Sequence, residues 1–240
     1  MERDVLKDEQ AQLVVDGLLI GYKEYLDLRK EMQKKLKVSA GFAFAKGNFI
    51  DDGVAKNTTS FMDYKLEKAG ESWEYLEFSF GESKPSLFII KNDYRLQQTF
   101  SKDKKKKTSR YLSNYAKINK STLDLVRRGQ RKVPNVSIQL ELSIDEPFIS
   151  EEELSKYENF YIVVYKTDIS KVIESVLLVL PDDETRVLHM IQDLSPYLQT
   201  TSITIEDEEY SAVVGEREEI VEVYDYDYTV PEEDKETSNE

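Results

Sequence analysis

Apolar residues that recur every three or four positions dominate the first 36 residues, and this pattern constrains the fold more than any other feature of the chain. The series comprises Ala11, Val15, Leu18, Tyr22, Tyr25, Met32 and Leu36. Such spacing puts these side chains on one side of an α-helix, and the series is interrupted only at Arg29. A second set of apolar residues widens that side, namely Val14, Leu19, Leu26 and Leu28. The pattern predicts a long amphipathic helix from about Asp8 to Leu36 that packs across a sheet, with a dimer seam as the alternative.

Two glycines, Gly17 and Gly21, fall inside this predicted helix. Glycine in a helix interior costs about 1 kcal/mol relative to alanine, so its presence calls for a reason. We interpret both glycines as positions where another element approaches the helix closely. The chain contains no glycine-rich phosphate loop.

Two segments near the middle of the chain have the composition of paired strands. Trp73–Phe80 and Ser86–Lys91 are rich in aromatic and β-branched residues, and residues 81–85 between them favour a turn. The sequence therefore predicts a β-hairpin in which Phe80 lies opposite Ser86. Ahead of it, residues 39–57 are expected to be irregular or to form short helices.

The second half of the chain is expected to alternate between strands and helix. Strands are predicted at Val133–Ser143, Phe160–Lys166 and Val172–Leu180, the last of them ended by Pro181. A helix is predicted from Asp182 to about Leu198, because acidic residues in a first turn suit the helix dipole. Its apolar side would comprise Val187, Ile191, Leu194 and Leu198.

These elements together predict an α+β fold. A long N-terminal amphipathic helix and further helices would pack on a mixed or antiparallel sheet within one globular domain over residues 1–200. The basic helical segment 102–132 would be inserted in this domain, and residues 201–240 would form an acidic, partly disordered tail. Two weak strands are expected in that tail, at Ser202–Ile205 and Ile220–Tyr228.

Composition excludes several classes of protein. The chain has 240 residues of which 40% are hydrophobic, which is enough for a core, and it has no cysteine. Disulfides, thiolate metal sites and cysteine nucleophiles are therefore excluded. The charged N-terminus lacks the pattern of a secretory signal, and no apolar stretch approaches the ~20 residues that span a bilayer. We expect a cytoplasmic protein, monomer or dimer, that makes no use of a membrane.

Charge is strongly segregated along the chain. Residues 201–240 hold fifteen acidic and two basic residues, whereas residues 102–132 hold twelve basic residues and only Asp103 and Asp124 as acidic ones. The net charge of −14 therefore comes almost entirely from the tail. Segregation of this kind indicates charged partners: DNA or RNA for the basic segment, and a protein partner for the acidic tail.

Residues 110–132 resemble the core of a helix-turn-helix unit. A helix over about Tyr111–Ile118, a break at Asn119-Lys120 and a second helix from Ser121 to Arg128 are predicted, with Asn119 or Ser121 as the cap and Asp124 completing a capping box. The residues that match the family pattern are Leu112, Ser113, Ile118, Ser121, Thr122, Leu123, Val126 and Gly129. The family pattern is broken where Lys117 replaces a turn glycine and Leu125 replaces a polar residue.

The resemblance implies roles for two sets of residues in this segment. Lys120, Ser121 and Thr122 would face base edges. Phosphate contacts would come from Arg127, Arg128, Arg131 and Lys132. A basic nucleic-acid contact of other geometry, or a merely solvated basic helix, are the alternatives.

The predicted hairpin supports a different hypothesis. Strand alternation places Glu77 and Lys91 on one face, and Asp51, Asp52 or Asp63 would supply a further carboxylate. Carboxylates that hold a metal and a lysine that activates water are the components of a metal-dependent nuclease, which would use Mg²⁺. Cross-strand charge pairing is the simpler alternative. The single histidine, His189, is expected on the surface of a helix, because one histidine without cysteines builds no zinc site.

The sequence leaves two classes of function open. The first is a non-catalytic macromolecular-binding protein that binds nucleic acid or acts as a regulator through segment 102–132, with an acidic tail that modulates binding. The second is a metal-dependent nuclease, and a toxin, antitoxin or phage-defence protein that acts through a protein partner is a further variant. The stretch Trp73–Asn92 resembles uncharacterised proteins of low-GC Gram-positive bacteria and their phages, which implies a mobile-element or defence context.

Overall fold

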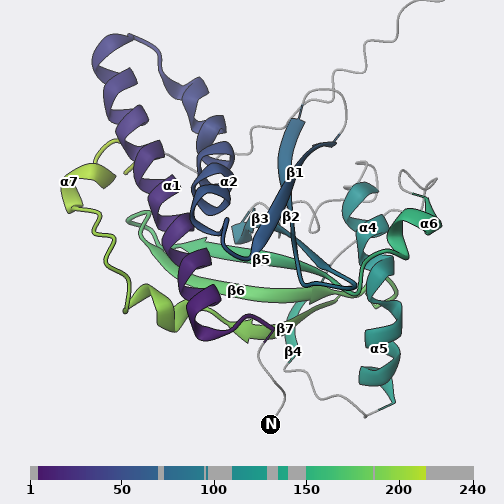
Figure 1. Cartoon of the computed structure of the whole chain (residues 1–240). Helices are drawn as coiled ribbons and strands as arrows, with labels where there is room; N and C mark the ends of the chain where they lie inside the picture. Colours follow the sequence, from purple (N-terminus) through teal and green to yellow (C-terminus); the bar gives the residue numbers. More distant parts are fainter. Residues whose placement is uncertain are drawn as a thin grey trace, which may run out of the picture.

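The computed structural model describes residues 5–69, 73–94, 96, 110–128, 135–139, 150–185 and 187–214. Within these residues a seven-stranded mixed sheet has the strand order β1-β2-β3-β5-β6-β7-β4, and helices lie against both of its faces (Figure 1). The strands are β1 Met62–Ala69, β2 Trp73–Phe80, β3 Ser86–Asn92, β4 Asn135–Gln139, β5 Phe160–Thr167, β6 Ile173–Pro181 and β7 Val187–Asp193. The predicted α+β class is confirmed.

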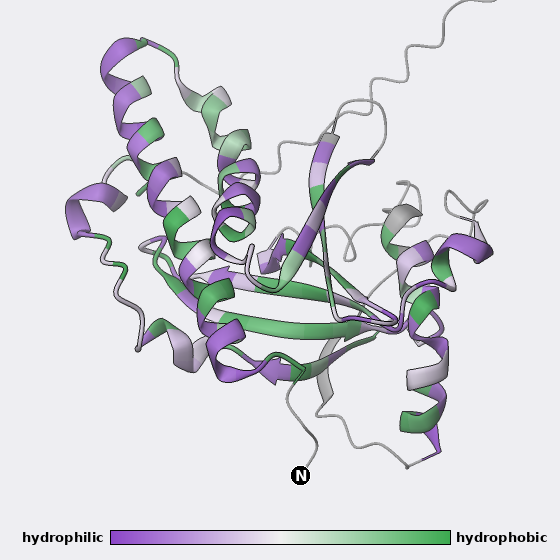
Figure 2. Ribbon diagram, in the orientation of Figure 1, coloured by the Kyte–Doolittle hydropathy of each residue, from purple (hydrophilic) through white to green (hydrophobic). Residues whose placement is uncertain are grey.

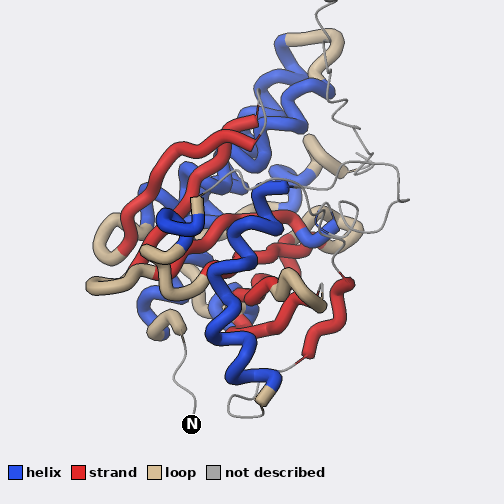
Figure 3. The backbone as a smooth tube through the Cα atoms, turned by 90° about the vertical axis from the view of Figure 1, so that its right-hand side faces the viewer, coloured by secondary structure: helices blue, strands red, loops and turns tan. Residues whose placement is uncertain are grey.

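The helices form two groups. The first group consists of α1 Asp8–Lys35, the 3₁₀ segment η1 Ala40–Ala45 and α2 Lys46–Asn57, and the chain returns to it with η3 Ser195–Leu198 and α7 Asp207–Tyr210. The second group consists of α4 Arg110–Ala116, η2 Lys117–Asn119, α5 Lys120–Arg127 and the short α6 Glu151–Leu154. Figure 3 shows α4, η2 and α5 as one continuous helical path across their side of the molecule.

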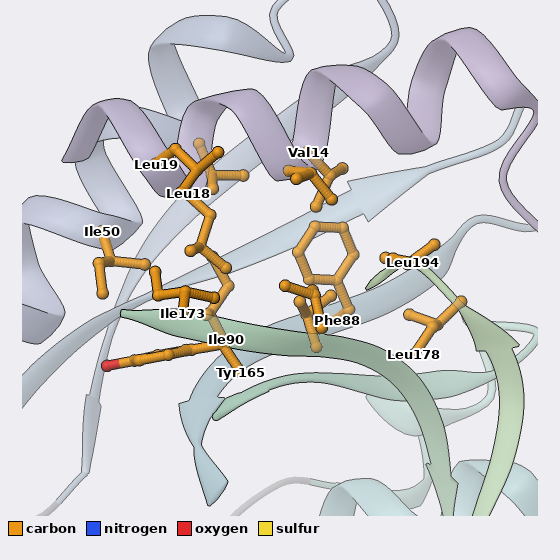
Figure 4. Packing of buried hydrophobic residues seen from close by; sticks show 14 of the residues in the cluster. Val14, Leu18, Leu19, Ile50, Phe88, Ile90, Tyr165, Ile173, Leu178 and Leu194 are labelled. Carbon is orange, nitrogen blue, oxygen red and sulfur yellow. The ribbon is translucent and has the colours of Figure 1, made fainter. Parts of the chain in front are cut away.

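The long N-terminal helix is confirmed, since α1 spans Asp8–Lys35. Its apolar side turns toward the sheet, as the colouring of Figure 2 shows, and Val14 and Leu18 pack there against a core that includes Phe88 (Figure 4). Arg29, which interrupts the apolar series, is also buried, and its Nη1 donates a hydrogen bond of 2.9 Å to the Ser39 carbonyl. The arginine therefore belongs to the buried side and holds the chain that follows α1.

The glycines of α1 bring α2 into close contact, as predicted. A Cβ atom added at Gly21 would lie 2.1 Å from the Phe49 carbonyl oxygen, and one added at Gly17 would lie 2.7 Å from the Val54 Cα. Gly53 of α2 faces both of them from the other side. The two backbones approach each other more closely than any side chain would permit, which fixes the position of α2.

The hairpin is confirmed together with its register, because β2 and β3 are antiparallel and Phe80 pairs with Ser86. β3 then pairs in parallel with β5, and β5 is apolar along nearly its whole length because helices cover both sides of it. The strands β5, β6, β7 and β4 are joined by antiparallel pairing. The strand β1 at the edge of the sheet was not predicted.

The helix predicted from Asp182 to Leu198 is wrong. Residues 187–193 form β7, which pairs with β6 on one side and β4 on the other. Asp182 does not open a helix; its Oδ1 accepts hydrogen bonds from the main-chain N–H groups of Glu184 and Thr185 in a tight turn. His189 consequently lies in an inner strand and is buried, so its predicted surface position is also wrong.

Residues 201–214 belong to the folded body. Ser202–Ile205 does not form the predicted weak strand, and the second weak strand, Ile220–Tyr228, lies outside the described residues. Tyr210 and Val213 are buried in the same core as α1. Among the described residues, no helix combines the length and apolar character needed to cross a membrane.

Candidate functional site

The sheet opens between β2 and β3. Their pairing is limited to three residue pairs and ends at Phe78 and Phe88, whereas β1 and β2 remain paired along their whole length. The β1–β2 ribbon therefore leaves the sheet beyond this point, as Figure 1 shows. Among the described residues, the pairing of β2 with β3 does not extend to Ile90 or Asn92.

A cavity of about 100 Å³ lies at this opening. α2 and η1 cover it, and residues of β2, β3 and β5 complete its walls. The lining residues are Ala43, Phe44, Lys46, Gly47, Asn48, Ile50, Asp51, Glu74, Tyr75, Ile90, Lys91, Asn92 and Tyr165. Aromatic walls with a few converging polar groups are typical of ligand sites.

Asp51 is the central polar group of the cavity. Its Oδ2 accepts a hydrogen bond of 3.1 Å from the Leu76 N–H. Leu76 lies in the part of β2 that no longer pairs with β3. Burial raises the pKa of the Asp51 carboxyl to about 6, and the Leu76 hydrogen bond and the Lys91 charge offset only part of that rise. A carboxyl with such a pKa in a cavity is typical of functional sites.

Lys91 lies beside Asp51 in the same cavity. Its Nζ is 5.5 Å from the centre of the Tyr75 ring, a cation–π distance, and its charge acts on the Asp51 carboxyl. The structure thus brings together two of the residues that the sequence suggested for a catalytic hairpin face.

The other catalytic candidates lie elsewhere. Glu77 is buried, and its Oε2 accepts a hydrogen bond from the Tyr115 hydroxyl of α4; burial raises the pKa of both groups. Asp52 is exposed and forms an ion pair with Lys56 one helical turn later, and Asp63 is exposed on β1. Across the described ranges, no three His, Asp or Glu side chains are grouped so that they could hold a metal ion.

Residues 110–128 of the basic segment form one helical rod, whereas the resemblance predicted two helices separated by a turn. Asn119, where the break was expected, keeps a right-handed helical backbone, and so does Lys120 after it. Asn119 stands at the N-cap position of α5, as one of the two predicted caps, but its side chain makes no capping bond. Instead its Nδ2 donates to the Phe160 and Pro181 carbonyls, both at 2.9 Å, and its Oδ1 accepts from the Phe160 N–H.

Two residues that were predicted to contact nucleic acid instead bind other side chains of the protein. Thr122 is buried, and its hydroxyl donates a hydrogen bond of 2.6 Å to Asn159, so it faces the sheet and not solvent. Arg127 forms ion pairs with Asp182 at 2.9 Å and Glu184 at 2.8 Å. Burial alone would raise the pKa of Asp182, but its hydrogen bonds and Arg127 outweigh burial and lower that pKa.

The remaining candidates of this segment share the outer side of the rod. Lys117, Lys120, Ser121 and Arg128 are exposed. Separations of three residues from Lys117 to Lys120, four from Lys117 to Ser121 and seven from Ser121 to Arg128 place them on one side of the helix. Arg131 and Lys132 lie outside the described residues.

Comparison of the chain with protein-family models, with curated proteins and with solved structures finds no match. Function therefore has to be inferred from the cavity at the sheet opening and the basic rod.

Proposed function

We propose that the protein binds nucleic acid through the outer side of the rod formed by α4, η2 and α5. The observation that carries this function is the row of exposed cations, Lys117, Lys120 and Arg128, at helical spacing on one side. Within the part of the chain that the structure describes, neither Lys120 nor Arg128 has an acidic partner. A row of solvated cations is the usual contact for phosphates.

The charge of this side continues in the neighbouring sequence. Residues 102–109 and 129–132 add seven lysines and arginines to the same part of the chain. Because Thr122 is turned inward, the rod has few groups that could read bases. Contacts to the phosphate backbone, independent of sequence and sensitive to salt, are therefore the expected mode of binding.

The double variant Lys120→Ala/Arg128→Ala tests this function. It removes two phosphate contacts, so DNA or RNA affinity at low salt should fall about tenfold and the slope of log K against log salt should decrease by about 1 to 2. Fluorescence anisotropy with single- and double-stranded oligonucleotides measures both quantities.

The matched control is Lys34→Ala/Lys37→Ala, which removes two exposed positive charges near the end of α1. This variant should bind as the wild type does. Equal binding by both double variants would contradict a contact through the rod.

A metal-dependent nuclease is the second candidate function, and one observation favours it: Asp51 and Lys91 line the same cavity. Glu74 also lines this cavity, but the described residues contain no group of three His, Asp or Glu side chains that could hold a metal ion. Cleavage of DNA or RNA with Mg²⁺ or Mn²⁺ that disappears in Asp51→Asn would establish this function, and the absence of cleavage by the wild type would dismiss it.

A further inference from the structure

The outer edge of β1 is an open edge of the sheet. β1 stands at the end of the strand order, and among the described residues it pairs with β2 alone (Figure 1). The strand has eight residues, Met62–Ala69, and each of them has a partner in β2 without a bulge. A strand of this length at an edge offers a row of main-chain donors and acceptors to a strand that lies beside it.

Three residues of β1 direct their main-chain groups outward. Asp51 lines the cavity together with residues of β3, so the Leu76 N–H that donates to it points toward β3 and away from β1. In an antiparallel ladder, two directly opposite residues that do not bond each other both point away from the pair, and Leu66 lies opposite Leu76. Tyr64 and Lys68, two positions to either side of Leu66, have the same direction. Each of the three therefore offers an N–H and a carbonyl at the open edge.

The side chains along this edge are also uncovered. Tyr64 and Leu66 are 57% and 58% exposed, although one is aromatic and the other aliphatic. Every residue from 63 to 68 is exposed except Glu67, which is half-buried. Exposed aromatic and aliphatic side chains on an edge strand gain free energy when a partner removes them from water.

The charges of β1 suit one kind of partner, a second copy of the same strand. Charged residues on an edge strand usually oppose pairing with another sheet, and β1 contains four of them, two acidic and two basic. Antiparallel pairing of β1 with the same strand of a second copy, centred on Leu66, places Lys65 of each copy opposite Glu67 of the other. Opposite charges in directly opposed positions stabilise a strand pair. In this register the charges therefore favour pairing instead of preventing it.

Other antiparallel registers are less favourable. A two-fold axis at a charged residue of β1 places that residue opposite its own equivalent, so that like charges meet. An axis at Tyr64 would need the Met62 N–H, which already donates a hydrogen bond of 3.0 Å to the Thr58 carbonyl. The axis at Leu66 avoids both problems. It also sets Tyr64 opposite Lys68 of the second copy, whose ammonium group can contact the ring.

We propose that β1 pairs with β1 of a second copy of the chain about a two-fold axis at Leu66, so that the two sheets join into one. The outward N–H and carbonyl groups of the two strands bond each other, and two Lys65–Glu67 pairs form between the copies. An interface of one strand from each copy falls below the ~1,200–2,000 Å² of stable interfaces, so the dimer should dissociate on dilution. The interface is separate from the rod and requires no nucleic acid.

Charge reversal tests the pairing, because the two charged positions meet only between copies in this register. Lys65→Glu alone, or Glu67→Lys alone, sets two pairs of like charges against each other and should weaken dimerisation at least about tenfold. An equimolar mixture of the two variants restores both pairs of opposite charges, so the mixture should dimerise as tightly as the wild type. Sedimentation velocity of the full chain over a concentration series measures all three. Glu82→Lys, the same change in the exposed turn after β2, should dimerise as the wild type does.

Hydrogen exchange locates the interface without any variant. The N–H groups of Leu66 and Lys68 should exchange more slowly as the concentration of the wild type rises, because carbonyls of the second copy accept them. The N–H of Lys65 points toward β2 and should exchange at a rate that is independent of concentration.

A wild-type chain that remains monomeric at every concentration would overturn the proposal, and so would a mixture of the two folded variants that fails to dimerise. A dimer that neither charge reversal weakens, or whose formation leaves the exchange of Leu66 unchanged, uses another surface such as α1 and also overturns it. Nucleic acid is absent from these measurements, so their outcome is independent of binding through the rod.

Discussion

At the scale of single residues, burial of the Asp51 carboxylate lowers the stability of the folded protein. Its pKa rises from 3.8 to about 6 on folding, and a shift of about two units corresponds to about 3 kcal/mol at most. Because the folded state holds the proton more tightly than the unfolded state, the loss is fully present above pH 6 and disappears as the pH falls below 3.8. Asp51→Asn, which retains an acceptor for Leu76, should therefore raise the free energy of unfolding by up to about 3 kcal/mol at pH 7.5.

The gain should shrink as the pH is lowered to about 4, and thermal unfolding at several pH values measures it. A variant that gains stability while it loses activity is typical of a functional residue. Loss of stability at every pH would instead show that the hydrogen bond to Leu76 outweighs burial.

At the scale of elements, the α1–α2 contact depends on glycine. A Cβ atom at Gly53 would lie 2.4 Å from the Gly17 carbonyl oxygen and 2.5 Å from the Gly21 nitrogen, and both are main-chain atoms that cannot rotate away. Gly53→Ala should therefore destabilise the protein by more than about 2 kcal/mol, despite the gain of about 1 kcal/mol in helix propensity.

Gly47→Ala is the matched control in the same helix, because a Cβ atom there would meet nothing within 4 Å. It should be neutral or stabilise the protein by up to about 1 kcal/mol. Urea denaturation measures both variants, and similar midpoints for the two would contradict the close contact between α1 and α2.

The spacing of apolar residues along the sequence was sufficient to predict the helices and strands that are buried on one side or on all sides. The α1 helix, the hairpin with its register, and the strands β5 and β6 all follow from apolar spacing. The β1 sequence alternates apolar residues with charged ones such as Lys65 and Glu67, which is the period-2 pattern of a strand, so β1 could have been predicted from the sequence. Residues 187 and 191 of β7 and residue 194 after it are spaced as in a helix, and only the pairing with β6 and β4 makes residues 187–193 a strand.

The candidate site was predicted only in part, for a related reason. The apolar residues that suggested a helix-turn-helix, such as Leu112, Ile118 and Leu123, are buried in the hydrophobic core, which requires the same spacing. Asp51 and Lys91 were suggested by residue type. The two side chains come together because the pairing of β2 with β3 ends early. That end depends on the tertiary structure and has no local signal in the sequence.

At the scale of the whole molecule, the chain carries opposite charges on two segments. The structure moves the boundary of the acidic segment, because Tyr210 and Val213 are buried against α1 and belong to the folded body. Residues 215–240 remain as a segment with eleven acidic and two basic residues, a net charge of −9. Residues 102–132 carry a net charge of +10. If the rod binds nucleic acid as proposed, we expect this tethered segment to compete with phosphates for the same cations.

Deletion of residues 215–240 should therefore tighten DNA or RNA binding about tenfold. A tethered segment has an effective concentration of order mM, so an affinity of only ~0.1 mM would keep the basic side occupied most of the time. Anisotropy titrations belong at low, fixed ionic strength, because contacts to about 6–10 phosphates lose ~10³–10⁵ in affinity between 50 and 200 mM salt. Replacing the eleven acidic residues of this segment by their amides keeps its length and should tighten binding equally. The gain should be absent in the Lys120→Ala/Arg128→Ala background, and a full-length protein that binds as tightly as the truncated one would contradict competition by the acidic segment.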